Sequence, residues 1–490
     1  MSLEVRDGAE IQGIEELDAD VVVVGSGAGG AVAAFELASA GRDVLVLEAG
    51  RHFKPSDFTQ RELDTMQTVY VDQGGQGPAD GSLSILQGRC VGGSTVVNGE
   101  VCFRTPEVVL NEWATRYGVP DFTTADLAPV FEEVEKRVHV TVNENRYLGT
   151  GTMMSRGMKA LNIDVKPVSR NVKGCRGCVY CFFGCAYGCK QSMDQSYLPA
   201  AVEASARIVS QAEVTRIKMS GDRATGVVAK TPHGELEVSA KAVVVACGAI
   251  QTPLLLIDNH LGGPEVGQHL AVHPVYFATG LFEEAKPDDA GAMLATYTDV
   301  FVEDGFMIET GSGSLAFGAA WVPGIGRAHK EQLRDLKYMW GGGAVVRDTG
   351  SLGRVRRNRK GAKVIDYKLD PVTQEKVRGA LKKMAEIQFA GGAKKVWFTT
   401  VRPRILSGPD EIKSLDQIGL GPADITAVSY HPQCTARMGT VTDYDGVVMG
   451  TKNVYVMDGS LFPTPVGVNP QISIMTVSTV LSRRLAAALA

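Results

Sequence analysis

The sequence contains no apolar run of the roughly 18 to 20 residues that a membrane-spanning helix needs. The longest candidate, residues 242–257, is interrupted by glycine, glutamine, threonine and proline. Residues 1–20 are acidic, whereas a secretory signal is basic and then apolar. We therefore expect no membrane span and a cytoplasmic location.

The sequence also lacks a strong bias of charge. Its 50 Lys and Arg against 55 Asp and Glu leave a net charge of −5, which argues against nucleic acid or an anionic membrane as the main partner. The 56 glycines follow no three-residue period, so the composition excludes collagen. Hydrophobic residues make up 44% of the 490 residues, which is enough for a buried core in two or three domains.

A strand, a glycine-rich turn and a helix follow one another near the start of the chain. The apolar residues 21–24 run into the turn 25–30 (GSGAGG), a helix of small residues is expected over 31–40, and a second apolar strand covers 44–47. This order is typical of a dinucleotide-binding βαβ unit. A GxGxxG motif alone is weak evidence, but the strand before it and the helix after it strengthen the interpretation.

Four residues of this unit have predicted roles. Gly25 would make the tight turn, Gly27 would let the backbone approach a pyrophosphate, and Gly30 would let the helix pack closely on the strand. Glu48, at the end of the second strand, can accept hydrogen bonds from an adenosine ribose. The N-terminus of the helix would face the phosphates.

Two later stretches predict that the chain returns to the same domain. Residues 206–238 are expected to form short antiparallel strands before a buried strand at 242–246, and a further apolar strand is expected at 453–457. Between them, 273–425 is β-rich with one clear helix, 371–390, which suits a sheet covered by a helix. Strands are expected there within 275–282, 313–322, 338–348 and 363–370.

The segment 88–104, GRCVGGSTVVNGEVCFR, resembles the flavin-contacting signature of the glucose-methanol-choline (GMC) oxidoreductases. The resemblance continues through VVVACGAIQTPLLL, VGQHLAVHP and YHPQCTARMG to VYVMDGSLFPTPVGVNPQIS near the end of the chain. The continuation of the first segment, FRTPEVVLNEW, most resembles the fatty alcohol oxidase branch, and the last segment also resembles cholesterol oxidase. The resemblance covers the cofactor part well and the substrate part poorly.

The resemblance implies an α/β fold (α+β overall) with a Rossmann-like FAD-binding domain, 1–272 and 426–490, that carries a cysteine-rich loop at 174–190. A β-sheet-based substrate-binding domain covered by helices would occupy 273–425. FAD is expected to be noncovalent, because relatives with attached FAD have a histidine where this chain has Thr95-Val96-Val97. The residues expected to contact FAD are Gly25, Gly27, Gly30, Glu48, Arg89, Gly92, Gly93, Ser94, Asn98, Val214, Asp458, Gly459, Asn469, Pro470 and Gln471.

The resemblance also implies two catalytic residues. Oxidation of an alcohol removes a hydride from carbon and a proton from oxygen, and a flavin accepts only the hydride. His431 matches the family's catalytic histidine and would be the base, and Asn469 matches the second member of a histidine-asparagine pair and would hold the substrate oxygen. Taken singly, His431 could be an ordinary loop histidine and Asn469 a helix cap before Pro470. His269 and His273 are assigned no chemical step.

Cysteine is scarce, with nine in the chain, yet five lie between residues 175 and 189. Cys175, Cys178, Cys181 and Cys185 have the C-x2-C-x2-C-x3-C spacing of a bacterial ferredoxin, which predicts the ligands of an iron-sulfur cluster of the 4Fe-4S type. Cys189 or a remote cysteine is an alternative to Cys185 as the fourth ligand. Bound zinc, disulfides and free buried thiols are the other interpretations of the run.

The sequence therefore predicts an FAD-dependent alcohol dehydrogenase that acts on the CH–OH group of a small-molecule alcohol. The iron-sulfur cluster would pass electrons to an external acceptor. The first alternative is an oxidase that uses O2 directly, with a structural or zinc-bound cysteine loop. The second is a flavin-bearing electron-transfer subunit without an alcohol substrate, for which the basic run 354–360 would be the partner surface; an ordinary solvated hairpin tip is the simpler interpretation of that run.

Overall fold

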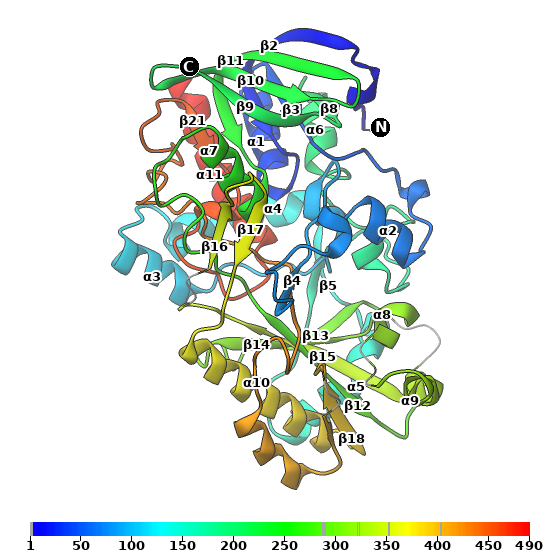
Figure 1. Ribbon diagram of the computed structural model, residues 1–490. Helices are drawn as coiled ribbons and strands as arrows, with labels where there is room; N and C mark the ends of the chain where they lie inside the picture. The colour runs from blue at the N-terminus through cyan, green and yellow to red at the C-terminus, as the bar shows by residue number, and fades with distance from the viewer. Residues whose placement is uncertain (1–2, 287–290, 321, 323, 351–352, 402–403) are drawn as a thin grey trace.

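Two large β-sheets, one above the other in Figure 1, organise the chain. The computed structural model describes residues 3–286, 291–320, 322, 324–350, 353–401 and 404–490. Both termini lie near the upper sheet, so the beginning and the end of the chain contribute to the same layer. The two sheets and their helices form a mixed α/β fold, which confirms the predicted fold class.

The first sheet contains the predicted dinucleotide-binding strands. Its strands within the described residues are β1 (Arg6–Asp7), β2 (Gly13–Val24), β3 (Val44–Leu47), β8 (Arg207–Ser210), β9 (Glu213–Ser220), β10 (Arg223–Lys230), β11 (Gly234–Val245) and β21 (Val454–Val456). The order is β1-β8-β3-β2-β11-β10-β9, with β21 beside β11. The strands β8, β3, β2, β11 and β21 pair in parallel, whereas β9 and β10 form an antiparallel extension.

The expectation of antiparallel strands throughout 206–238 is therefore wrong for β8. This strand pairs in parallel with both β1 and β3. The physical reason is the connection: β8 is reached from β3 by a long excursion of the chain rather than by a tight turn, and only tight turns require antiparallel neighbours.

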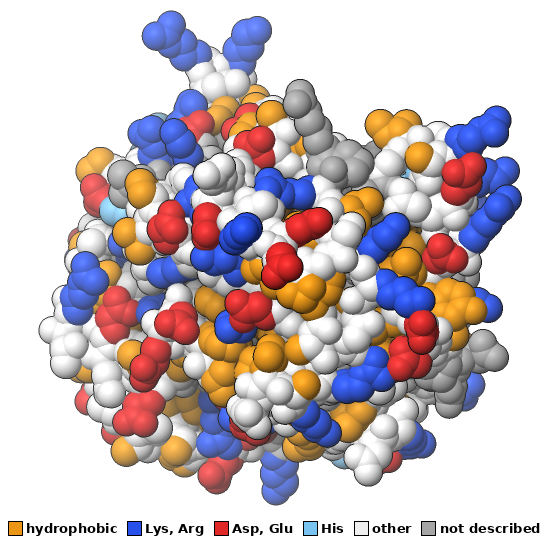
Figure 2. Space-filling model, turned by 90° about the horizontal axis from the view of Figure 1, so that it is seen from below, with side chains coloured by type: hydrophobic (Ala, Val, Ile, Leu, Met, Phe, Trp, Pro, Cys, Tyr) orange, Lys and Arg blue, Asp and Glu red, His pale blue; other side chains and the backbone are white. Residues whose placement is uncertain are grey.

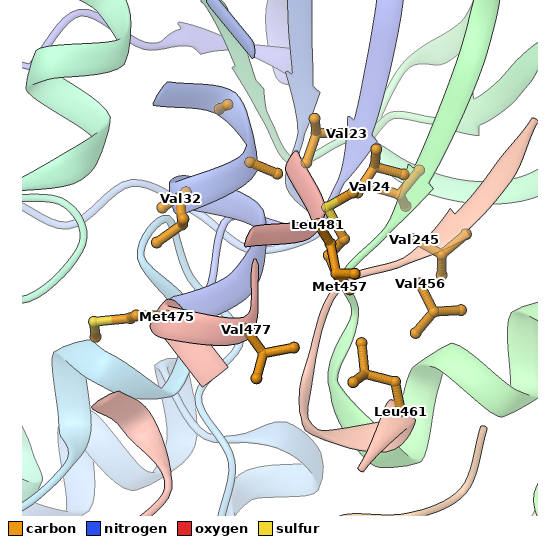
Figure 3. Packing of buried hydrophobic residues seen from close by; sticks show 14 of the residues in the cluster. Val23, Val24, Val32, Val245, Val456, Met457, Leu461, Met475, Val477 and Leu481 are labelled. Atoms are coloured by element: carbon orange, nitrogen blue, oxygen red, sulfur yellow. The ribbon is translucent and has the colours of Figure 1, made fainter. Parts of the chain in front are cut away.

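Helices from both ends of the chain pack on this sheet. The helix α1 (Ala28–Ser39) follows β2 directly, and α11 (Gln471–Ala488) packs beside α1. Small side chains on α1, which include Gly29 and Gly30, allow the close approach. Figure 3 shows the resulting core, to which strands and helices contribute Val23, Val24, Val32, Val245, Val456, Met457, Leu461, Met475, Val477 and Leu481.

The second sheet is mostly antiparallel and has the order β19-β18-β12-β15-β14-β13-β6, with β20 pairing to β12 and β4. Its strands are β4 (Leu83–Ile85), β6 (Lys166–Pro167), β12 (Val275–Leu281), β13 (Leu294–Thr298), β14 (Phe306–Gly311), β15 (Met339–Val346), β18 (Lys395–Phe398), β19 (Ile405–Leu406) and β20 (Ala427–Ser429). The strands β4, β6 and β20 come from outside 273–425. The domain boundaries at residues 273 and 426 stay a prediction.

The predicted long helix is present as α10 (Pro371–Ala390) and covers the second sheet. The Asp370 side chain caps it by accepting hydrogen bonds from the backbone N–H groups of Val372 and Thr373. Proline at the first helical position needs no hydrogen-bond partner for a backbone N–H. These local signals explain why the helix begins where the sequence predicts.

One expected strand is wrong. Within 313–322 the structure has a helix, α8 (Leu315–Ala320), and Trp321 lies outside the described residues. The strand before it, β14, already pairs with β13 on one side and β15 on the other, so no free edge beside β14 is left for a further strand. Alanine and leucine in LAFGAA favour a helix once sheet pairing is unavailable.

The basic run forms an exposed hairpin of β16 (Arg354–Arg357) with β17 (Lys363–Asp366), separate from both large sheets. The other elements are α2 (Glu62–Thr68), α3 (Glu107–Tyr117), α4 (Thr124–Arg137), α5 (Thr152–Ala160), α6 (Tyr197–Glu203), α7 (Gly248–Asp258), α9 (Arg327–Gln332), β5 (Val140–Val142) and β7 (Ser169–Asn171). On the face that Figure 2 shows, basic and acidic side chains are interspersed. Among the helices of the described residues, none is long and apolar enough to cross a membrane.

Candidate active site

A cavity of about 900 Å³ runs from the glycine turn after β2 to the strands β12, β14 and β15 of the second sheet. Most of the residues predicted to contact a cofactor or substrate lie on its wall. They are Gly25, Gly27, Glu48, Arg89, Gly93, Ser94, Asn98, Val214, His431, Asp458, Gly459, Asn469, Pro470 and Gln471. Gly30 and Gly92 are not among the lining residues, and each lies next to one that is, Gly25 and Gly93 respectively.

The backbone of the glycine turn lies very close to other backbone atoms, which leaves no room for a side chain at Gly25 or Gly30. Gly25 has a φ of +98°, and a Cβ atom there would lie 2.5 Å from the Ala246 carbonyl oxygen. A Cβ on Gly30 would lie 2.0 Å from the Gly25 carbonyl oxygen, so no side chain fits at this position in the first turn of α1. Gly27 precedes α1 and offers no side-chain cap, which leaves the first amides of α1 available to a phosphate.

A second glycine pair lies against the first turn. Gly92 and Gly93 have φ values of +94° and +57°, and a Cβ on Gly93 would lie 2.8 Å from Cα of Gly27. The Gly92 N–H donates to Oγ of Ser26 at 2.9 Å, which joins the two loops. Both loops therefore present bare backbone to the same end of the cavity.

Glu48 is buried at this end, and burial raises its pKa despite its hydrogen bonds. Its carboxylate accepts from the backbone N–H and the hydroxyl of Ser26 and from the N–H of Gly50. A carboxylate has about four acceptor positions, so one remains for a ribose hydroxyl. Asp458, by contrast, uses its oxygens to hold Gly248, Thr252 and Ser460, which makes it a brace between the ends of β11 and β21.

The N-terminus of α11 borders the same cavity. Pro470 precedes the helix without a side-chain cap, so the positive end of the helix dipole faces the cavity. Gln471 accepts a hydrogen bond from the Asn98 amide at 3.0 Å and donates to the Val101 carbonyl at 2.7 Å. Two bare glycine loops, an acidic residue and two uncapped helix ends fit the pyrophosphate, ribose and ring system of FAD.

His431 forms a pair with His273 on the cavity side of the second sheet. Their Nδ1 atoms lie 3.2 Å apart, and both rings are buried. The backbone N–H of Gly467 donates to Nε2 of His273 at 2.9 Å, so the proton of the neutral His273 ring lies on Nδ1. That proton is donated to Nδ1 of His431, and Nε2 of His431 then carries its own proton into the cavity. Burial lowers the pKa of His431 to about 3, which keeps the ring neutral.

Glu309 on β14 lies beside Asn469 and was missed by the sequence analysis. Burial raises the pKa of Glu309 to about 7, and a hydrogen bond from Asn469 opposes the shift. Within the described residues, Oε1 of Glu309, Oδ1 of Asn469 and the hydroxyl of Tyr430 are buried without a hydrogen-bond partner. All three residues line the cavity. Buried polar atoms without partners are uncommon, so this group indicates the position of a polar ligand.

The structure does not support the predicted iron-sulfur ligands, although burial and the nearby Cys185 and Cys175 raise the pKa of both Cys178 and Cys189. No group of three or more His, Cys, Asp or Glu in the described part of the chain could hold a metal ion. Cys181 is buried, and its pKa is raised by burial and by Glu100. Cys189 donates its N–H to the Cys185 sulfur, and its pKa is raised to about 11 by burial and by Cys185 and Cys175. The spacing of cysteines along the chain does not specify the direction of each side chain, and the Cys181 side chain is directed toward Glu100.

The cysteine-rich loop instead forms part of the cavity wall. Phe182 stacks on Tyr430 with ring centroids 4.9 Å apart, and its carbonyl accepts from the Tyr70 hydroxyl at 2.7 Å. The buried Lys190 donates to the carbonyls of Val96, Asn98 and Cys181. The loop is therefore fastened to the glycine-containing segment at one end of the cavity and to the polar group at the other.

The glycine loops, the uncapped helices and the polar group around one cavity define an FAD-dependent oxidoreductase. The GMC oxidoreductase family models match residues 20–275 and 349–478. The chain belongs to the GMC oxidoreductase family, which confirms the predicted family and class of enzyme.

Proteins similar over almost the whole chain include two curated relatives and a solved structure. An uncharacterized GMC-type oxidoreductase of Mycobacterium tuberculosis is 35% identical over 476 residues, which is 94% of this chain and 74% of that protein. Long-chain-alcohol oxidase FAO3 of Arabidopsis thaliana is 30% identical over 511 residues, 95% of this chain and 68% of that protein. Pyridoxine 4-oxidase from Mesorbium loti has a TM-score of 0.74 at 17% identity and covers 95% of this chain and 98% of its own. At that identity the solved structure supports the fold alone.

Proposed function

We propose that the protein oxidises an alcohol to a carbonyl compound with noncovalently bound FAD. The observation that carries the proposal is the set of unpartnered polar atoms of Glu309, Asn469 and Tyr430 next to His431 on the cavity wall. The similarity to a long-chain-alcohol oxidase supports an alcohol as the substrate. Bound FAD would accept the hydride from the alcohol carbon and pass two electrons on to an acceptor.

The two-part organisation belongs to this proposal. The part formed by 1–272 and 426–490 binds FAD, with the turn from Gly25 to Gly30 and the start of α1 at the pyrophosphate and Glu48 at the ribose. The segment 92–98 and the start of α11 contact the ring system. The part formed by 273–425 binds the substrate. Thr95, Val96 and Val97 offer no histidine for a covalent link, so heat or acid denaturation should release free FAD.

The substrate oxygen is held by His431 and Asn469. With Nε2 of His431 protonated, the ring donates a hydrogen bond to that oxygen, and the Asn469 amide fixes its orientation. Holding the oxygen at two points aligns the carbon for hydride loss. His273 acts through His431 and is a positioning residue.

Removal of the hydroxyl proton has two candidates. The sequence assigns it to His431, and this remains a prediction. The hydrogen bonds of His273 support a second assignment, because they leave Nε2 of His431 without a lone pair for the proton. Glu309 has an unpartnered oxygen and a pKa raised to about 7 by burial, which suits a general base near neutral pH. We assign the proton to Glu309.

Anaerobic mixing with a panel of primary and secondary alcohols tests the proposed function. We expect the 450 nm absorbance of the flavin to bleach with at least one alcohol. If none bleaches it, the chain is better described as an electron-transfer subunit. Hydrogen peroxide formed under air would identify an oxidase, whereas turnover with a dye but not with O2 would identify a dehydrogenase with an external acceptor. The proposed mechanism contains no iron-sulfur relay, because the described residues include no group that could hold a metal ion.

A further inference from the structure

The cavity extends beyond the polar group along the second sheet. Its wall there is apolar and aromatic, and three consecutive glycines of β15 form a flat floor without side chains. The residues of this extension are Phe277, Phe317, Val322, Leu336, Met339, Gly341, Gly342 and Gly343. Such a wall accommodates an extended hydrocarbon segment and offers it no hydrogen bonds.

A lysine interrupts this apolar wall. Lys286 lines the cavity, and its backbone N–H donates to the Lys337 carbonyl at 2.7 Å, which fixes the base of the side chain. Its ammonium group donates to Oγ of Ser312 at 3.1 Å. The side-chain partner of this ammonium group within the described residues is the Ser312 hydroxyl and no carboxylate, and burial lowers the pKa of Lys286 to about 8. A partly buried ammonium without a counter-ion is costly unless a ligand supplies the negative charge.

The separation between Lys286 and Glu309 can be inferred from strand β14, since Lys286 contacts Ser312 just beyond the end of that strand. Ser312 directly follows β14 and is three residues beyond Glu309, which corresponds to about 10 Å of extended chain. A ligand that reaches from Glu309 to Lys286 must therefore have a spacer of several carbon atoms between two polar ends.

We propose that Lys286 and Ser312 bind the carboxylate of a substrate whose hydroxyl lies at Glu309 and Asn469, so that the substrate class is an ω-hydroxy carboxylic acid of medium chain length. This inference rests on the proposed function. The Lys286 ammonium has three donors, of which one is given to Ser312, and the Ser312 hydroxyl can turn to donate as well. These donors match the two oxygens of a carboxylate, whereas a phosphate has more oxygens to satisfy and is commonly bound by several donors, often arginine.

Competing substrates of equal length test the inference. The kcat/KM for 8-hydroxyoctanoate divided by that for 1-octanol is measured by anaerobic flavin reduction in the holoenzyme. We expect the ratio to exceed one and to fall at least about tenfold in Lys286→Met, since a hydrogen bond to a charged group is lost. Lys286→Arg keeps the charge and should retain most of the preference. Lys337→Met, an exposed lysine on the neighbouring segment, is the matched control and should leave the ratio unchanged.

Binding of octanoate, which has no hydroxyl to oxidise, gives a readout independent of turnover. Titration calorimetry should show at least about tenfold weaker binding in Lys286→Met than in the wild type or Lys337→Met. If 1-octanol is oxidised but neither the ratio nor octanoate binding depends on Lys286, the inference is overturned and the proposed function stands. If octanoate binding depends on Lys286 while no alcohol or hydroxy acid reduces the flavin, the anion site stands and the proposed function fails.

Discussion

The two ends of the cavity differ in whether their buried polar groups have hydrogen-bond partners within the described protein. At the glycine loops, Glu48 and Asp458 are occupied by hydrogen bonds to backbone amides and hydroxyls of the protein itself. At the second sheet, Glu309, Asn469 and Tyr430 leave buried atoms without partners in the described structure. The first end is thus rigid before any ligand arrives, and the second has hydrogen-bonding capacity that a substrate can use.

The largest expected effect is at the rigid end. Gly30→Ala would bring a Cβ within 2.0 Å of the Gly25 carbonyl oxygen. Because both atoms belong to the turn itself, we expect the free energy of unfolding to fall by about 3 kcal/mol. We also expect the variant to lose bound FAD. The ratio of absorbance at 450 nm to that at 280 nm and a thermal melt measure this. Gly408→Ala, at an extended glycine with nothing within 4 Å of the added carbon, should behave as the wild type. Full FAD retention in Gly30→Ala would contradict the proposed rigidity.

The next effect is at the open end. Glu309→Gln should slow anaerobic flavin reduction by about 10²-fold or more if Glu309 is the base. In the wild type the carboxylate is the competent form, so the rate should rise with pH and reach half its maximum near pH 7, where the raised pKa of Glu309 lies.

His431→Gln separates the two candidate bases. Glutamine can still donate a hydrogen bond, so this variant should be slower than the wild type but keep the rise of rate near pH 7. If the rise disappears in His431→Gln and persists in Glu309→Gln, the base is His431. A wild-type rate that is flat between pH 5 and 9 would also argue against Glu309.

A smaller effect is expected at the wall between the two ends. Phe182→Ala removes the ring that stacks on Tyr430, and such ring pairs contribute about 0.5 to 1.5 kcal/mol. We expect kcat/KM for an alcohol to fall by about tenfold or less while FAD stays bound. In Phe182→Leu the kcat/KM should fall less, because leucine keeps part of the apolar wall. Equal kinetics for the wild type and Phe182→Ala would mean that the loop does not contact the substrate.

The smallest effect is expected within the cysteine-rich loop. Cys178 is partly exposed, so Cys178→Ser should change stability by less than about 1 kcal/mol and leave turnover unaltered. Cys181 is buried, and Cys181→Ser should cost about 1 to 3 kcal/mol. Iron analysis accompanies both variants. If the wild type contains stoichiometric iron and Cys178→Ser loses both the iron and turnover, the result would support the predicted cluster.

The sequence predicts best where function depends on local backbone geometry. Gly25, Gly27 and Glu48, for which contact with FAD stays a prediction, all lie on the cavity wall, because a strand, a turn and a helix in succession have few ways to fold. Glu309 has no such signal. It is one acidic residue in the strand FMIETG, and only the packing of β14 against Asn469 makes it unusual.

The sequence predicts less well where the outcome depends on side-chain direction or on strand pairing. The cysteine spacing predicts ligands on one loop but cannot say that Cys181 turns toward Glu100. The apolar residues 313–322 suit a strand or a helix, and the neighbours of β14 decide between them. His273 was left without a role, since its position beside His431 depends on segments 158 residues apart.

Lys190 joins the segment 92–98, the cofactor segment, to the cysteine-rich loop, and this link couples the local unfolding of the two. Its buried ammonium holds three carbonyls, two from the cofactor segment and one from the loop. Separating either segment from the lysine would leave a charge in a dry environment, so the two should not unfold independently. Their amides should therefore exchange with deuterium at a common rate, as one cooperative unit whose opening exposes both the bound cofactor and the wall beside the substrate.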